Sequence, residues 1–263
     1  MERLTTALPP PLLEVEQLTL AFGGVTALTA VSFTVLPGEL FAVIGPNGAG
    51  KTSIFNCLSG VYRPKSGTMA FAGECLNGLS PVAIAERGIA RTFQNLALFS
   101  DLTVLDNLML GRHHLMRTGY LAAALWLGRA RREELAHRKR CEEILELLEL
   151  EGFRFSRVAA LPYGVRKRIE LGRALAMEPK LLLLDEPVAG MNQEESEDMA
   201  RYTLEIQREL GIAIILVEHD MHLVMDIADR VLALDFGRAL RLGTPDEVRD
   251  DPAVIQAYLG ASA

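Results

Sequence analysis

Short apolar runs alternate along the chain with longer stretches of helix-forming residues. The runs lie at residues 40–44, 181–184 and 212–217, and each is followed by glycine or by polar residues. Uninterrupted apolar runs of this length are typical of strands that helices cover on both faces, as in parallel sheets. Helix-like stretches such as 53–58 and 196–210 lie between them. The pattern predicts an α/β fold with a doubly wound, mainly parallel sheet.

The pattern changes between about residues 95 and 160. Strand-like runs vanish there and helix formers dominate, as in residues 142–150. Helices that simply flank the sheet are the alternative, but the stretch is too long for one crossover between neighbouring strands. We therefore predict one domain over residues 1–263, with a helical subdomain inserted at residues 95–160.

The sequence Gly-Pro-Asn-Gly-Ala-Gly-Lys-Thr at residues 45–52 matches the pattern GxxxxGK[ST]. It stands between an apolar run and a helix-like stretch, which makes a chance glycine-rich turn a poor explanation. Glycines let successive backbone N–H groups turn toward a phosphate, and the start of a helix adds a favourable dipole. Lys51 is expected to reach the terminal phosphates of a nucleotide, and Thr52 to hold Mg²⁺ through its hydroxyl group.

Acidic residues and a histidine follow the next two apolar runs. Asp185 and Glu186 come directly after residues 181–184, and His219 comes shortly after residue 217. The carboxyl ends of parallel strands share one edge of a sheet, so we expect these side chains to emerge there together. Asp185 can hold Mg²⁺, Glu186 can accept a proton from an attacking water, and His219 can sense the terminal phosphate. Solvated strand ends are the alternative, which a phosphate loop in the same chain disfavours.

Composition and charge narrow the class of protein. Hydrophobic residues make up 49% of the chain and charged residues 23%, as in an ordinary globular protein. The net charge of −7 supplies no basic footprint, so nucleic acid is a minor hypothesis. Cys57, Cys75 and Cys141 have no metal-site or redox spacing and are expected to be buried or idle thiols.

The N-terminal residues 1–11 contain prolines where a signal peptide needs an uninterrupted apolar stretch. The most apolar helical candidate, residues 120–127, is far shorter than the ~20 residues that cross a bilayer. We therefore expect a cytoplasmic protein whose tie to a membrane runs through a partner.

The order of these features resembles that of the ATP-binding subunits of ABC transporters, over almost the whole chain. The features, in order, are Phe22, the phosphate loop, Gln94 within Arg91-Thr92-Phe93-Gln94, a signature segment at residues 161–165, the pair Asp185 and Glu186, and His219. The resemblance implies a P-loop NTPase core with an antiparallel N-terminal β-subdomain around residues 13–35 and an inserted α-helical subdomain.

The resemblance also implies a role for each matching residue, with ATP and Mg²⁺ as cofactors. Phe22 stacks on adenine, Gln94 links the metal and the γ-phosphate to the helical subdomain, and Gly164 belongs to the segment that covers the ATP of a partner chain. The expected catalytic residues are Lys51, Glu186 and His219. The expected metal ligands are Thr52, Gln94 and Asp185. The expected nucleotide contacts are Phe22, Gly45, Pro46, Asn47, Gly48, Ala49, Gly50, Lys51, Thr52, Ser53, Gln94, Gly164 and Asp185.

A closer likeness is to the ATPases of branched-chain amino acid importers. It rests on residues 91–94, 98–99, 102–104 and 107–108, on the long insert around Trp126, and on the ending at residues 243–245, 251–252 and 257–260. Related importers of urea, amides or other amino acids share these segments. The resemblance thus implies ATP-driven import of branched-chain or other amino acids, with urea or amides as the alternative cargo.

Several partners follow from the resemblance. Two ATPase chains meet head to tail, as a homodimer or a heterodimer, and each completes the ATP site of the other. ATP binding closes the pair and hydrolysis reopens it, which moves two transmembrane permease subunits. An external solute-binding protein delivers the solute to those subunits. The chain is then peripheral on the inner face of the cell membrane, with no nucleic acid partner.

Two rival functions remain. A soluble ABC regulator of ribosomes or DNA generally carries tandem ATP sites or a very long coiled-coil insert, and this chain shows neither. A non-catalytic nucleotide-binding subunit is opposed by the presence of Lys51, Glu186 and His219.

Two departures from the family pattern concern the signature and a later loop. The signature usually reads Leu-Ser-Gly-Gly-Gln, but Pro162 replaces the serine, Tyr163 the first glycine and Val165 the glutamine. Asn192 stands where the loop after Glu186 usually has an aspartate. A proline offers neither the hydroxyl nor the backbone N–H that can bind a phosphate. In a heterodimer the two ATP sites are then unequal, with the site built on Lys51 and Glu186 of this chain the stronger, unless Tyr163 and backbone N–H groups compensate.

Overall fold

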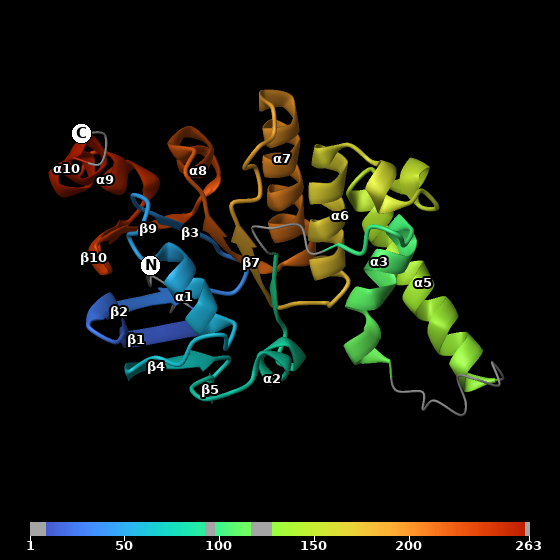
Figure 1. Cartoon of the computed structure of the whole chain (residues 1–263), viewed down its shortest axis with the longest axis horizontal. Coiled ribbons are helices and arrows are strands. Elements are labelled where there is room, and N and C mark those ends of the chain that lie inside the picture. Colours follow the sequence, from blue (N-terminus) through green and yellow to red (C-terminus); the bar gives the residue numbers. More distant parts are fainter. Residues whose placement is uncertain (1–8, 93–97, 117–127, 261–263) are drawn as a thin grey trace, which may run out of the picture. The chain divides into compact units, whose positions relative to one another are not determined.

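The computed structural model of the chain describes residues 9–92, 98–116 and 128–260. The described residues up to 84 and from 207 onward form one compact unit, and those between 85 and 206 form the other. Figure 1 shows their helices and strands. The observed elements confirm the predicted mixture of a parallel α/β core, an antiparallel N-terminal sheet and helices. The predicted bounds of the helical subdomain, residues 95–160, stay a prediction.

The first unit opens with an antiparallel sheet. Its strands are β1 (Leu13–Phe22), β2 (Val25–Val35), β4 (Ser66–Phe71) and β5 (Glu74–Cys75), in the order β2-β1-β4-β5. β2 lies antiparallel to β1 across a short turn, with Leu13 opposite Val35. Buried apolar residues of β1 and β2, among them Leu13, Leu18 and Leu28, form the core under this sheet.

Buried parallel strands form the second layer of the first unit. β3 (Leu40–Ile44) lies between β8 (Ala213–Val217) and β9 (Arg230–Asp235), and pairs with both in parallel. β10 (Arg238–Gly243) adds antiparallel to β9. Every residue of β3 and β8 is buried, as their unbroken apolar sequences predict. Val43 lies opposite Val217, so the segments that follow β3 and β8 leave the sheet at the same edge.

Helices complete the first unit. α1 (Lys51–Leu58) follows the phosphate loop, and α8 (Met221–Ile227) follows β8. The C-terminal helices are α9 (Pro245–Arg249) and α10 (Pro252–Gly260). Helix α2 (Pro81–Glu86) leads into the second unit. Burial raises the thiol pKa of Cys57 in α1 to about 11, so this cysteine is a core residue, as expected, while Cys75 is exposed.

The second unit contains a pair of parallel strands, β6 (Ile89–Arg91) and β7 (Leu181–Asp185). Its helices are α3 (Val104–Gly111), α5 (Arg129–Leu147), α6 (Tyr163–Leu175) and most of α7 (Gln193–Leu210). Short 3₁₀ turns lie at His113–Leu115, Glu151–Phe153 and Val158–Ala160. None of the helices in the described ranges is long and apolar enough to cross a membrane.

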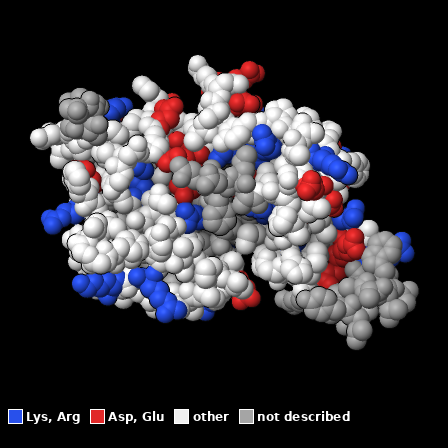
Figure 2. All heavy atoms as spheres, in the orientation of Figure 1, with Lys and Arg blue, Asp and Glu red and all other residues white. Residues whose placement is uncertain are grey.

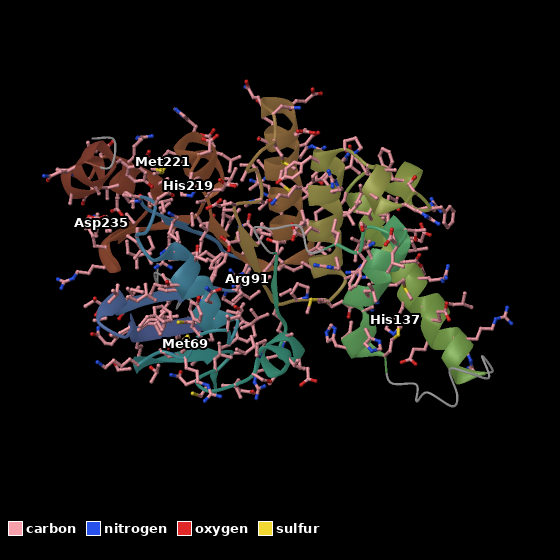
Figure 3. All side chains as sticks on the ribbon, in the orientation of Figure 1. Met69, Arg91, His137, His219, Met221 and Asp235 are labelled. Atoms are coloured by element: carbon pink, nitrogen blue, oxygen red, sulfur yellow. The ribbon has the colours of Figure 1, made fainter. Side chains whose placement is uncertain are left out.

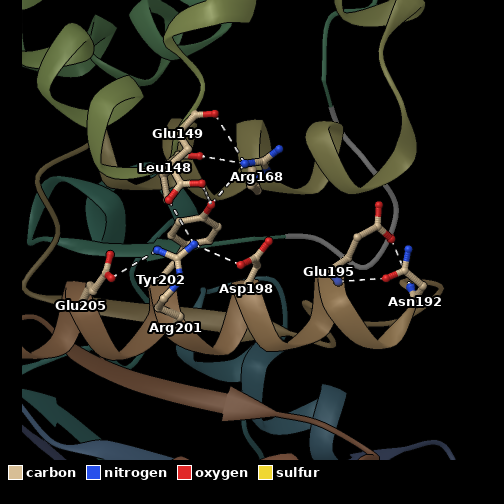
Figure 4. A network of polar contacts seen from close by, with 9 residues as sticks. All are labelled: Leu148, Glu149, Arg168, Asn192, Glu195, Asp198, Arg201, Tyr202 and Glu205. Carbon is tan, nitrogen blue, oxygen red and sulfur yellow. Dashed lines mark hydrogen bonds and ion pairs between the residues drawn. The ribbon is translucent and has the colours of Figure 1, made fainter.

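Glycine allows close packing of the helices in the second unit. A β-carbon at Gly172 of α6 would touch the side chains of Leu108 in α3, Ile144 in α5 and Leu148, the residue that follows α5. A partly buried polar cluster joins α6 to α7 (Figure 4). The Tyr202 hydroxyl donates to Glu149 at 3.0 Å and accepts from Arg168 at 3.2 Å. The ring of Tyr202 is fully buried, which makes these bonds costly to leave unmade.

Lys and Arg side chains are dispersed over one face of the molecule. Figure 2 shows Lys and Arg scattered among uncharged residues, without a continuous basic surface on the described part of the face in view. This distribution agrees with the net charge of −7 and gives no support to a nucleic-acid surface on that face.

A buried carboxylate fixes the start of β3. Glu39 accepts hydrogen bonds from the backbone N–H of Leu36 and from Arg230 at 3.0 Å, and its side chain is nearly inaccessible. We predict that Glu39→Ala lowers the free energy of unfolding by about 1–3 kcal/mol, because a buried N–H loses its acceptor. Glu39→Gln keeps one acceptor, so its free energy of unfolding, measured by denaturant titration, should fall less. Nucleotide affinity should not change, since Glu39 lies at the opposite end of β3 from the phosphate loop. An unchanged denaturant midpoint for Glu39→Ala would contradict the stabilising role given to Glu39.

Candidate functional site

The phosphate loop, residues 45–52, connects β3 to α1 in the first unit. Gly45, Gly48 and Gly50 all have positive φ, at 150°, 81° and 108°. A β-carbon at Gly45 would overlap the carbonyl of Leu234, and one at Gly50 would meet the carbonyl of Ala27. The glycines that the motif requires are therefore needed both for the backbone turn and for close contact with neighbouring strands.

Helix α1 begins at Lys51, and no side chain caps its first turn. Uncapped N–H groups at a helix start, together with the helix dipole, attract an anion. The Lys51 ammonium donates to the carbonyls of Gly45 at 2.7 Å and Pro46 at 3.0 Å, and the side chain is buried. Thr52 is exposed beside it, so its hydroxyl is accessible. These features fit a phosphate group, with a cation and backbone donors in place.

The outer side of the loop borders a cavity of about 710 Å³. Residues 46–49 form one wall, the β9–β10 turn with Asp235 and Phe236 forms another, and α10 contributes Ala253, Gln256 and Ala257. The loop is thus supported on one side by strands and open on another.

His219 lies in the loop that follows β8, within the first unit (Figure 3). Because β3 and β8 are parallel and in register, His219 and the phosphate loop share one edge of the sheet. The backbone N–H of His219 donates to the buried Glu218 carboxylate at 3.0 Å, and Asp220 caps α8. The expected meeting of His219 with Asp185 and Glu186 stays a prediction.

Phe22 ends β1 and is half exposed. Tyr62 packs edge-on against it, with ring centroids 4.9 Å apart and an interplanar angle of 74°. The pair presents an aromatic surface suited to a flat ring such as adenine. Sequence reasoning missed Tyr62, because the contact joins residues 40 positions apart and no local pattern signals it.

Asp185 ends β7 in the second unit, and its side chain is 2% exposed. Arg91, at the end of the neighbouring β6, forms an ion pair with it at 2.8 Å, and Thr92 accepts a hydrogen bond from its backbone N–H. The carboxylate therefore already neutralises a cation, which is the chemistry that Mg²⁺ requires of a ligand. Glu186 follows in a left-handed conformation with φ 50°, where the chain turns sharply out of the strand.

The signature segment precedes α6. Pro162 is the N-cap residue of α6 and offers no side-chain bond to the helix start. The Tyr163 hydroxyl donates to the carbonyl of Ala189 at 3.2 Å, which ties the signature to the loop after Glu186. A β-carbon at Gly164 would overlap the carboxylate of Glu195, so a larger residue at this position would displace that side chain.

Asn192 caps the next helix, α7. Its side-chain oxygen accepts from the N–H of Glu195 at 2.9 Å, while the Glu195 carboxylate accepts from the N–H of Asn192 at 3.1 Å (Figure 4). Asparagine and aspartate cap helices about equally well. The departure at this position thus preserves the local fold of the loop.

Some predicted residues lie outside the described part of the chain. They are Phe93, Gln94 and Trp126. Leu98 and Phe99 are described, and the Phe99 ring is 57% exposed.

Two family profiles match the sequence. The profile described as ABC transporter covers residues 28–189, and the profile described as branched-chain amino acid ATP-binding cassette transporter covers residues 242–263. The chain belongs to the ABC transporter family. The resemblance inferred from the sequence is thereby confirmed.

Named relatives of this ABC protein include transport ATP-binding proteins. The chain is 40% identical to the high-affinity branched-chain amino acid transport ATP-binding protein BraF of Pseudomonas aeruginosa, and 39% identical to LivG of Escherichia coli, which has the same description. Each alignment covers 95% of this chain and 98% of the relative.

Solved ABC cassettes share the fold. A nucleotide-free ATP-binding cassette superposes with a TM-score of 0.82 at 28% identity, over 95% of this chain and 99% of the other. The ADP conformation of an ATP-binding cassette gives 0.83 at 28% identity, over 96% and 100% of the two chains.

The buried Lys51 ammonium gives a direct test of the phosphate loop. Lys51→Met keeps the length and apolar stem but removes the charge, so we predict nucleotide affinity weaker by roughly tenfold to a hundredfold. Titration with a fluorescent nucleotide measures this, and a thermal unfolding scan checks that the variant is folded. The exposed Lys65 supplies the matched control, since Lys65→Met should bind as the wild type does. Equal affinities of both variants would remove Lys51 from the site.

Proposed function

We propose that this chain binds and hydrolyses ATP with Mg²⁺ and drives an importer of branched-chain amino acids. The observation that carries the proposal is the phosphate loop, with glycine-only backbone positions, an uncapped helix start and the Lys51 ammonium in one strand–loop–helix unit. The C-terminal profile match and the names of the relatives supply the solute class. Importers of urea, amides or other amino acids remain the alternative.

Each candidate residue has a role in this proposal. Backbone N–H groups of the loop, with Lys51 and Ser53, bind the terminal phosphates, and Phe22 stacks on adenine. Bound Mg²⁺ would supply charge neutralisation at the phosphates, held by Thr52, Asp185 and Gln94. The Glu186 carboxylate accepts the proton of the attacking water, and His219 contacts the γ-phosphate. Positive φ at Glu186 supports a constrained, functional position for this carboxylate.

A second ATPase chain completes each site in the proposal. The start of α6, with Gly164 in its first turn, directs backbone N–H groups and the positive end of the helix dipole outward, which suits the ATP of a partner chain. Closing and reopening of the pair would move two permease subunits, to which an external solute-binding protein delivers the solute.

Phe99 is the proposed contact with a permease subunit at the inner face of the membrane. Its ring is exposed, while buried Asn107 holds its backbone from both sides, accepting from the Phe99 N–H at 2.9 Å and donating to the Phe99 carbonyl at 3.0 Å. A fixed backbone with an exposed aromatic ring is typical of an interface anchor. Crosslinking from a cysteine at position 99 in the assembled transporter tests this contact.

Purification from detergent-solubilised membranes separates the proposed function from its rivals. Permease subunits should co-purify with the chain, whereas ribosomal proteins or DNA-binding partners would favour a soluble regulator. In vesicles that hold the complete complex, ATP-dependent uptake of labelled leucine, isoleucine or valine supports the proposed cargo. Uptake of urea or amides in their place would assign the alternative.

The carboxylate of Glu186 gives the decisive test of hydrolysis. Glu186→Gln keeps the shape and hydrogen bonding but cannot accept a proton, so we predict ATP binding near the wild-type level and turnover reduced by roughly a hundredfold or more. The closed dimer should live longer with ATP, which size measurements detect. The exposed Glu194 in α7 provides the matched control, Glu194→Gln. Turnover at the wild-type rate in Glu186→Gln would exclude this residue as the base.

Pro162 makes the two ATP sites of a heterodimer unequal in the proposal. This signature faces the ATP of the partner chain, so Pro162→Ser should improve that ATP site, by roughly tenfold in affinity or turnover, through one added hydrogen bond to a charged group. The measurement is ATPase activity of the assembled transporter after separate inactivation of Glu186 and of the partner's equivalent carboxylate. Equal losses in the two cases, with no gain from Pro162→Ser, would show that Tyr163 and backbone groups compensate.

A further inference from the structure

The ion pair between Arg91 and Asp185 places a cation on the carboxylate proposed to hold Mg²⁺. Arg91 ends β6 and Asp185 ends β7, and the two strands are parallel with Arg91 opposite Leu183. One nitrogen of the guanidinium lies 2.8 Å from Oδ2 of Asp185. Figure 3 shows Arg91 among the side chains of this strand end. Both side chains are buried, at 9% and 2% exposure.

The backbone around the pair is fixed. The N–H of Thr92 donates to the Leu183 carbonyl at 3.0 Å, and the Thr92 hydroxyl accepts from the N–H of Asp185 at 3.3 Å. These bonds hold the ends of β6 and β7 together, so the guanidinium and the carboxylate meet without a free loop between them. The ion pair uses Oδ2, one of the two carboxylate oxygens.

A buried carboxylate needs a counter-charge, because an isolated ion in a protein interior is strongly disfavoured. In the nucleotide-free chain Arg91 provides that charge. A divalent cation at the same carboxylate would stand close to the guanidinium, and the two positive charges would repel each other in a poorly screened environment. Phosphate groups that arrive with the metal would offset this repulsion.

We propose that Arg91 is a positioning residue that acts as the counter-ion of Asp185 while no nucleotide is bound. Mg²⁺ then binds at Asp185 only together with nucleotide phosphates. The inference rests on the proposed nucleotide and Mg²⁺ site. It assigns Arg91 the function of coupling metal binding to nucleotide binding. A residue that only orients Asp185 for the metal would have the opposite effect on Mg²⁺ affinity when it is removed.

The test compares the full chain with its variants Arg91→Gln, Arg91→Lys and Asp185→Asn. Fluorescent ADP avoids turnover, and its affinity is measured across a Mg²⁺ titration. For Arg91→Gln we expect that the Mg²⁺ concentration giving half of the change in ADP affinity is roughly threefold to tenfold lower than in the wild type. The reason is that the guanidinium, which repels Mg²⁺, is gone. Arg91→Lys keeps the charge and should stay within about twofold. Asp185→Asn should lose most of the Mg²⁺ effect.

A second measurement uses the wild-type chain and does not depend on the folding of a variant. Mn²⁺, followed by electron paramagnetic resonance, should bind with ADP present and should not bind at Asp185 at the same concentrations without it. Thermal unfolding without metal should show a lower midpoint for Arg91→Gln, with a larger gain on addition of Mg²⁺ and ADP than in the wild type. A purely structural role would lower the midpoint and leave the Mg²⁺ concentration at half effect unchanged.

Three results would overturn the inference. The first is an unchanged or higher Mg²⁺ concentration at half effect in Arg91→Gln. The second is a shift of that concentration by fivefold or more, roughly 1 kcal/mol, in Arg91→Lys. The third is Mn²⁺ binding by the nucleotide-free wild type that Asp185→Asn abolishes. In each of these cases a Mg²⁺ effect on ADP binding by the wild type leaves the proposed function intact. A wild-type chain whose ADP binding ignores Mg²⁺ would refute both the inference and the proposed metal site.

Discussion

Backbone atoms of neighbouring strands crowd the phosphate loop so closely that its first and sixth positions accept only glycine. The carbonyl of Leu234 in β9 lies against Gly45, and the carbonyl of Ala27 in β2 lies against Gly50. The N–H of Gly237 donates to Ala49 at 2.9 Å, which joins the loop to the β9–β10 turn as well. The shape of the loop thus depends on two distant parts of the chain, β2 and the β9–β10 region. The direction of α1, the position of Lys51 and the exposure of Thr52 depend in turn on that shape.

Charges in and near the candidate site are balanced before any ligand arrives. Carbonyl groups of Gly45 and Pro46 surround the Lys51 ammonium, and Arg91 faces Asp185. Burial makes an unbalanced charge costly, so each group needs a partner in the empty protein. An anion and a cation that enter together can take over these roles without creating an unpaired charge. In the proposed function, this balance favours a nucleotide that arrives together with its metal over either one alone.

Much of this arrangement is legible in the sequence because it depends on local rules. Unbroken apolar runs predicted β3, β7 and β8, and the glycine spacing predicted the loop between β3 and α1. Long-range pairing is not encoded in such patterns. Arg91 and Asp185 are 94 positions apart, and Tyr163 reaches Ala189 across 26. These contacts depend on how strands and helices pack, so the sequence singled out Arg91 only within a motif. The cap that Asn192 forms with Glu195 is local, three residues along, but comparison with the family pattern marked Asn192 only as a departure.

The hydrogen bond from Tyr163 to Ala189 joins the signature segment, which in the proposed function meets a partner chain, to the loop that begins after the carboxylate at position 186. A glycine, the usual residue there, has no side chain with which to form it. Displacement of the signature by a neighbouring chain then strains the bond, and displacement of the loop strains it equally. Thermodynamic linkage requires such an effect to be reciprocal. A change at the signature segment that alters this bond therefore affects the loop beside Glu186. A change in that loop affects the signature segment with the same coupling free energy.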